Sequence, residues 1–222
     1  MTTPYYADEF VTIFHGDCRE IDEWLAADVL VADPPYGIGW KRSANAARLS
    51  KSHDGIANDA DTSARDAALD LWGGVRPAAV FGSFYACQPS NVRQVLVWHK
   101  GDTQGVVGST TGFRRDVEPV FLVNAWPVRT VEWSSVVRSH RGSWNDELAA
   151  TSHPHTKPID LMRTIIDRCP PGVVADPFMG SGSTLRAAKD LGRKAIGVEL
   201  DERYCEIAAR RMGQGVLIME GM

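Results

Sequence analysis

The sequence predicts an α/β fold, in which one doubly wound, mainly parallel sheet forms a single domain of residues 1–222 with inserted loops. Three observations support this prediction. Short apolar runs alternate with amphipathic segments along the chain. Two of the apolar runs end in turn-rich corners, Asp33–Tyr36 and Gly180–Thr184. The 222 residues, 44% of them hydrophobic, are enough to bury one substantial core.

Strands are predicted at short runs of apolar residues that are flanked on both sides by residues typical of turns. In chain order these runs are Phe10–Phe14, Val29–Ala32, Ala78–Phe81, Val95–Trp98, Val120–Val123, Val173–Ala175, Ala195–Val198 and Val216–Met219. Helices are predicted where apolar residues recur at helical spacing, at Arg19–Ala26, Ala64–Trp72, Ile159–Arg168, Leu185–Leu191 and Glu202–Met212. Because ligands bind at the carboxyl edge of such sheets, we expect both corners to meet there.

The first corner, Asp33-Pro34-Pro35-Tyr36, directly follows the run Val29–Ala32. Such a corner can be a plain strand-terminating turn, because proline fixes φ and aspartate tolerates turn geometry. It also has the groups needed to activate an exocyclic amine such as adenine N6, whose lone pair is delocalised into the ring. The Asp33 carboxylate and a proline carbonyl can each accept an N–H hydrogen bond and favour a pyramidal nitrogen in the transition state. Tyr36 offers a face on which a base can stack.

The second corner runs from Val173 to Thr184, where a strand breaks into glycines before a helix. It lacks the third small residue of a dinucleotide fingerprint, since Leu185 stands there, and the lysine of a phosphate loop. It can be a tight turn, or a site for a ligand that carries a carboxylate for the helix N-terminus and an ammonium for Asp176. The next strand ends at Glu199, 17 residues after Gly182, where an acid usually binds ribose hydroxyls.

These two corners, with His153-Pro154-His155-Thr156-Lys157-Pro158 upstream of the second, resemble the S-adenosylmethionine-dependent DNA amino-methyltransferases of the permuted type. In that type the catalytic motif precedes the cofactor motif. The resemblance covers nearly the whole chain, from Phe14-His15-Gly16-Asp17 to the helix ending near Met212. It implies a Rossmann-like methyltransferase fold and S-adenosylmethionine as the cofactor. Trp98-His99-Lys100 followed by Glu118 resembles the middle region of the family, although a tryptophan at a strand end is more typical of a core.

The resemblance also implies a role for particular residues. The catalytic residues would be Asp33, Pro34, Pro35 and Tyr36. The cofactor adenine would lie against Asp17 and Cys18, its ribose at Glu199 and Leu200, and its methionine carboxylate near Lys157. The methionine end would be lined by Asp33, Asp176, Phe178, Gly180, Ser181, Gly182, Ser183 and Thr184. The family commonly has other residues at positions 155, 156 and 183. Because those contacts are partly through the backbone, we expect only modest effects on affinity.

The formal net charge of −4 argues against a nucleic-acid partner, because affinity for DNA rests largely on phosphate neutralisation. The charge is unevenly distributed, however. Residues 37–56 hold four basic residues and one acidic residue, and residues 129–144 hold three and one. Both stretches lie outside the predicted strands, so we expect DNA-recognition loops at 40–61 and 124–150 rather than solvated faces alone. The expected contacts with double-stranded DNA are made by Lys41, Arg42, Arg138 and Arg141.

The sequence further predicts a cytoplasmic protein of a prokaryotic or phage-infected cell. Its longest apolar stretches fall far short of the roughly 20 residues that cross a membrane, and its N-terminus lacks the pattern of a signal peptide. The four cysteines show no C-x-x-C spacing, so neither a disulfide framework nor a metal site is expected.

We therefore expect a site-specific DNA methyltransferase that rotates a base out of the duplex and methylates its amine, without a metal or a covalent enzyme intermediate. Aspartate rather than serine at position 33 favours adenine N6, by the tendency of the family. Three alternatives stay open: N4-cytosine methylation, methylation of RNA or a protein amide, and a non-catalytic binding protein that retains the fold. The short chain predicts a short target or help from a second subunit, as in a homodimer.

Overall fold

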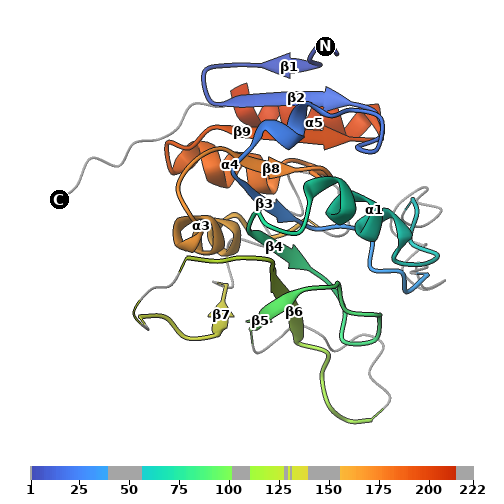
Figure 1. The fold of residues 1–222 in the computed structure, drawn as a ribbon, viewed down its shortest axis with the longest axis vertical. Coiled ribbons are helices and arrows are strands. Elements are labelled where there is room, and N and C mark those ends of the chain that lie inside the picture. Colours follow the sequence, from blue (N-terminus) through green and yellow to red (C-terminus); the bar gives the residue numbers. More distant parts are fainter. Residues whose placement is uncertain are drawn as a thin grey trace.

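A computed structural model describes residues 2–39, 57–101, 111–127, 130, 132–139 and 156–213. In these residues nine strands form one sheet in the order β1-β2-β9-β8-β3-β4-β6-β5-β7, from β1 at the top of Figure 1. The strands are β1 Tyr6–Ala7, β2 Val11–His15, β3 Val29–Ala32, β4 Ala78–Phe81, β5 Val92–His99, β6 Val117–Val123, β7 Val136–Arg138, β8 Val174–Asp176 and β9 Ala195–Glu199. The helices are η1 Glu23–Ala26, a 3-10 turn, and α1 Ser63–Trp72, α3 Ile159–Arg168, α4 Ser183–Asp190 and α5 Glu202–Gly213.

Helices cover both faces of this sheet. Buried residues of α3, α4 and α5 form one core with alternate side chains of the strands, such as Val29 and Val31 of β3. The other face packs Leu30 and Ala32 of the same strand against Trp24 of η1 and residues of α1. Successive side chains of a strand point to opposite faces, so the all-apolar β3 fills both cores. The predicted doubly wound architecture is confirmed.

The strand directions bring the functional corners together. Strands β2, β9, β8, β3 and β4 run parallel to one another. Strand β6 is antiparallel to both β4 and β5, which pairs Phe81 with Val120 and Trp98 with Glu118. The carboxyl ends of β2, β3, β8 and β9 therefore lie at the same edge of the sheet as the start of β6. We call this edge of the sheet the catalytic edge.

The predicted helix Arg19–Ala26 is wrong, because only the four residues of η1 are helical. The Asp17 carbonyl accepts the amides of Glu20 and Ile21, which makes a turn. The Cys18 carbonyl, which an α-helix would bond to the amide four residues on, instead accepts the Trp24 indole N–H at 3.0 Å. Burial of that indole thus replaces the first helical hydrogen bond.

Other predicted elements match closely. The predicted bounds of β3, β4 and α3 are those of the structure, and α4 begins at Ser183, two residues before the predicted start. Two short strands were not predicted. One is β1 at the edge of the sheet. The other is β7, which lies inside the segment expected to be the second recognition loop and pairs with β5. The strand predicted at Val216–Met219 lies outside the described residues. None of the helices described here is both long and apolar enough to cross a membrane.

Candidate active site

Asp33 immediately follows β3 at the catalytic edge, and its carboxylate is held by two donors. The Lys157 ammonium donates to both Asp33 oxygens, at 2.8 Å to Oδ1 and 2.7 Å to Oδ2. The Tyr36 hydroxyl donates to Oδ1 at 2.9 Å. Lys157 also lies 3.0 Å from the Tyr36 hydroxyl oxygen, which can accept one of its protons. Asp33 and Tyr36 of the first corner therefore form one cluster with Lys157, which belongs to a different motif of the sequence.

Lys157 is buried, and aromatic rings surround its ammonium. The nitrogen lies 5.3 Å from the centroid of the Tyr36 ring and 5.1 Å from that of Phe81, within the range of cation–π attraction. Burial lowers the Lys157 pKa, but the charges of Asp33 and Glu118 outweigh burial and the pKa lies above its ordinary value. The lysine is therefore a buried cation at neutral pH, here held by carboxylates.

Glu118 of β6 completes the cluster, although it was not among the predicted site residues. Its Oε2 lies 3.2 Å from the Tyr36 hydroxyl and 3.7 Å from the Lys157 nitrogen. Its Oε1 pairs with the Lys100 ammonium at 2.5 Å. Two carboxylates thus face two ammonium groups. The motif Trp98-His99-Lys100 followed by Glu118 was the sequence signal for this part of the site. That signal was weak because a tryptophan at a strand end is typical of a core, and Trp98 is in fact buried.

Asp176 ends β8 and is buried without an ion-pair partner among the described residues. Its Oδ1 accepts the Phe178 amide at 3.0 Å, and the Thr184 hydroxyl also hydrogen-bonds to it. Burial raises the pKa of Asp176 to about 7, and the nearby charges of Asp33 and Glu199 act in the same direction. The Asp33 and glycine corners are therefore close enough to interact electrostatically, and a cation beside Asp176 would relieve the cost of its charge.

The glycine corner has the backbone conformation expected of it. Gly180 and Gly182 have φ of 51° and 81°, a region that L side chains rarely adopt. A Cβ on Gly182 would also lie 2.9 Å from the Ala208 Cβ of α5, so this glycine serves helix packing as well as the turn. The next side chain, Ser183, has a buried hydroxyl with no hydrogen-bond partner within the described part of the chain.

Glu199, at the end of β9, holds the loops around it. Its two oxygens accept the amides of Gly180 at 2.9 Å and Asp201 at 2.8 Å. Burial raises the pKa of Glu199, with these amide bonds acting against burial. The neighbouring Leu200 is exposed. The predicted ribose-binding acid therefore already positions the glycine corner.

The corner after β2 lies at the same edge, because Gly16 donates its amide to the Glu199 carbonyl at 2.9 Å. Asp17 pairs with Arg19, and this pairing holds the pKa of its carboxyl below the ordinary value. Cys18 is buried, and burial raises its pKa to about 12, so it is an uncharged apolar side chain.

The residues present fit the predicted cofactor. Asp176 is a buried carboxylate that lacks a cation, and Ser183 is a buried hydroxyl that lacks a partner in the described residues. Both lie at a turn whose glycines let the backbone approach a ligand. An amino-acid moiety with an ammonium and a carboxylate has complementary groups for the acid and for the N-terminus of α4.

Of the predicted DNA contacts, only Arg138 is described. It is exposed at the end of β7 and pairs in register with His99 of β5, which places it at the catalytic edge. Lys41, Arg42 and Arg141 lie outside the described residues.

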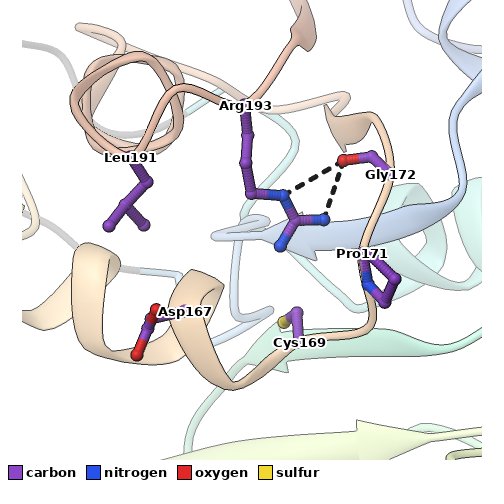
Figure 2. Close-up of a pocket in the computed structure, with 6 residues that line it drawn as sticks. All are labelled: Asp167, Cys169, Pro171, Gly172, Leu191 and Arg193. Atoms are coloured by element: carbon purple, nitrogen blue, oxygen red, sulfur yellow. Dashed lines mark hydrogen bonds between the residues drawn. The ribbon is translucent and has the colours of Figure 1, made fainter.

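A hollow of about 410 Å³ lies on the opposite edge of the sheet and is unrelated to this cluster. Figure 2 shows its lining, in which Gly172 and Arg193 stand just before the amino ends of β8 and β9. The Arg193 guanidinium donates to the carbonyls of Ile166, Pro170 and Gly172 at 2.7–3.1 Å. It therefore ties the end of α3 to the start of β8.

Comparison with known proteins assigns the class. The family model described as DNA methylase matches residues 88–210, more than half of the chain. The chain belongs to this family, the S-adenosylmethionine-dependent DNA amino-methyltransferases that act on adenine N6 or cytosine N4. It is a DNA methyltransferase, and the predicted cofactor is confirmed as that of the family.

Individual relatives support the assignment. In an alignment 267 positions long, the chain is 37% identical to the type II methyltransferase M.ScaI of Streptomyces caespitosus, and the alignment covers 94% of this chain and 83% of the relative. Two solved structures share the fold. A complex of M1.HpyAVI with S-adenosylmethionine has a TM-score of 0.61 at 21% identity, over 92% of this chain and 100% of that one. The cytosine-N4-specific PvuII DNA methyltransferase has a TM-score of 0.65 at 16% identity, over 96% and 90%.

Proposed function

We propose that this protein is a site-specific enzyme that methylates adenine N6 in double-stranded DNA after rotating the base out of the helix. The observation that carries the proposal is the Asp33 carboxylate, which follows β3 beside the glycine corner of β8. An aspartate followed by two prolines at this place gives an amine two acceptors next to the site of an amino-acid-bearing cofactor. The domain would comprise residues 1–222.

The cofactor, when bound, supplies a methyl group activated by a sulfonium centre. Asp176, Ser183 and the N-terminus of α4 would hold its amino-acid end, and Glu199 would lie at its ribose. We place Asp17 and Cys18 at its adenine, as the family resemblance implies. In the structure the Lys157 ammonium bonds to Asp33. Its expected place near the methionine carboxylate of the bound cofactor stays a prediction.

The chain itself would activate the amine. Asp33 and the Pro34 carbonyl accept its two N–H groups, which stabilises a tetrahedral nitrogen more than the flat ground state. Held in this way, the nitrogen lone pair would face the methyl group that the cofactor supplies, and the Asp33 carboxylate, through its hydrogen bond to the amine, would take up the proton that the methylated nitrogen releases. Rotating the base out costs a few kcal/mol, and stacking on Tyr36 would return about 1–3 kcal/mol. Orientation of the amine supplies much of the rate.

Tyr36 remains protonated in this role. Burial raises its pKa well above the ordinary value, and the charges of Asp33 and Glu118 act in the same direction. At neutral pH its hydroxyl is therefore a hydrogen-bond donor that keeps the ring beside the carboxylate.

DNA contacts would come from the two segments 40–61 and 124–150, with Arg138 at the rim of the catalytic edge. Neither segment has the apolar periodicity of a recognition domain with its own core, which favours a short target sequence or a second copy of the chain. Its bacterial type II relative favours the cytoplasm as its location.

The second candidate is methylation of cytosine N4. The same two acceptors would serve that amine, and one structure with the same fold is a cytosine-N4-specific methyltransferase. Aspartate at position 33 is what favours adenine here.

Nucleoside analysis tests the proposal. The purified protein is incubated with labelled S-adenosylmethionine and a DNA of mixed sequence, and the product is hydrolysed to nucleosides. We expect labelled N6-methyladenine. Labelled N4-methylcytosine alone would support the second candidate, and transfer to RNA but not to DNA would contradict both.

A further inference from the structure

The structure shows a conflict at Asp33. The proposed reaction, on which this inference rests, needs the Asp33 carboxylate to accept from the target amine. In the free protein that carboxylate already accepts two hydrogen bonds from Lys157 and one from Tyr36. Three of its roughly four acceptor positions are therefore filled. The ammonium also neutralises its charge, which makes it a weaker acceptor for a neutral amine.

Glu118 is a second acceptor for the same two donors. A tyrosine hydroxyl has one proton, so Tyr36 donates either to Asp33 Oδ1 at 2.9 Å or to Glu118 Oε2 at 3.2 Å, and never fully to both. The Lys157 nitrogen lies 3.7 Å from the same Oε2. A movement of about 1 Å toward Glu118 would convert that ion pair into a hydrogen bond.

Glu118 is also fixed and charged, as an alternative acceptor must be. Its backbone belongs to β6 and pairs in register with Trp98 of β5. Lys100 holds its other oxygen at 2.5 Å. Burial raises the Glu118 pKa, but Lys157 and Lys100 outweigh burial and leave that pKa below its ordinary value.

We propose that Glu118 is a positioning residue of the methyl transfer, which takes Lys157 and the Tyr36 hydroxyl over from Asp33 and so frees the Asp33 carboxylate for the target amine. Without the Glu118 charge, Lys157 has one carboxylate in place of two, and its pairing with Asp33 strengthens. The amine then competes against a tighter ion pair.

The experiment compares Glu118→Gln with wild type in single-turnover methyl transfer to DNA. Glutamine keeps the size of the side chain and an oxygen for Tyr36, but not the charge that attracts Lys157. We expect the transfer rate to fall about 10- to 100-fold, while the Kd for S-adenosylmethionine and for DNA each stay within about two-fold. Glu118→Asp keeps the charge but withdraws it by one methylene, and should give an intermediate rate with the same unchanged Kd values.

Asp116→Asn is the matched control. This carboxylate lies two residues before Glu118 and pairs with Arg114 at 3.2 Å and His99 at 3.8 Å, both of them outside the cluster around Lys157. We expect a rate within about two-fold of wild type, because in the described residues Asp116 pairs with Arg114 and His99 and not with Lys157 or Lys100.

A double-mutant cycle tests the route of the effect. If Glu118 acts through Lys157, then adding Glu118→Gln to Lys157→Gln should slow transfer no further. Additive losses in this cycle would overturn the proposal. A Glu118→Gln rate equal to that of wild type would also overturn it, because another acceptor, such as the cofactor carboxylate, would then release Asp33. If wild type itself transferred no methyl group to DNA, the proposed function would fail first, which separates the two failures.

Discussion

Replacing Asp176 with Asn should stabilise the cofactor-free protein at alkaline pH and weaken its binding of S-adenosylmethionine. Burial raises the Asp176 pKa from its ordinary 3.8 to about 7. The folded state therefore holds this proton more tightly than the unfolded state, and between these two pH values folding stability falls as pH rises. At 1.36 kcal/mol per pH unit, ionising the buried acid costs up to ~4 kcal/mol of stability above pH 7. Asparagine resembles the protonated acid and avoids that cost.

The assay is reversible urea denaturation of wild type and Asp176→Asn without cofactor, at pH 4.5 and at pH 8. The variant should be more stable than wild type by about 1 kcal/mol at pH 4.5 and by ~2–4 kcal/mol at pH 8. Calorimetry should show weaker cofactor binding by the variant at pH 8, because the carboxylate that attracts the ammonium is gone. A variant that is no more stable than wild type at pH 8, or that binds the cofactor equally well, would refute the reasoning.

Three further outcomes are expected. Gly182→Ala should cost about 1–3 kcal/mol of stability and weaken cofactor binding, because φ is 81° and the new Cβ would lie 2.9 Å from Ala208; calorimetry and urea denaturation measure both, and an unchanged protein would contradict the turn geometry. Arg193→Ala should cost about 2–3 kcal/mol of stability through the lost carbonyl contacts, with a normal transfer rate, whereas the exposed neighbour Lys194→Ala should cost little. Alanine at all four predicted DNA contacts, Lys41, Arg42, Arg138 and Arg141, should lower DNA affinity and flatten its salt dependence. Binding isotherms at several salt concentrations measure both, and isotherms that match wild type would disprove this placement of the DNA contacts.

The sequence was most informative where local chemistry alone determines structure. Strand β3 is apolar at every position and ends at Asp33-Pro34, so both its bounds and its corner were predictable. The glycine corner was predictable for the same reason, since φ of 81° at Gly182 suits glycine. The doubly wound topology followed from the alternation of elements and placed these corners at one edge.

The rest depended on contacts between distant residues. The helix expected at Arg19–Ala26 gave way to a turn because the Trp24 indole bonds to Cys18, a packing event with no local signature. Strand β7 has three residues and exists only through its pairing with β5. Glu118 joins the site because antiparallel pairing of β5 and β6 carries it to the catalytic edge, 82 residues away from Tyr36 in sequence.

The most direct test of the account concerns Asp33, the acceptor on which the proposed chemistry depends. Asp33→Ala should bind S-adenosylmethionine with at most modest weakening by calorimetry and should show no detectable labelled-methyl transfer to DNA. Lys157 stays partly neutralised in this variant, because Glu118 lies 3.7 Å from its nitrogen. Methyl transfer near the wild-type rate by a folded, cofactor-binding Asp33→Ala protein would contradict the assignment of this carboxylate to the target amine.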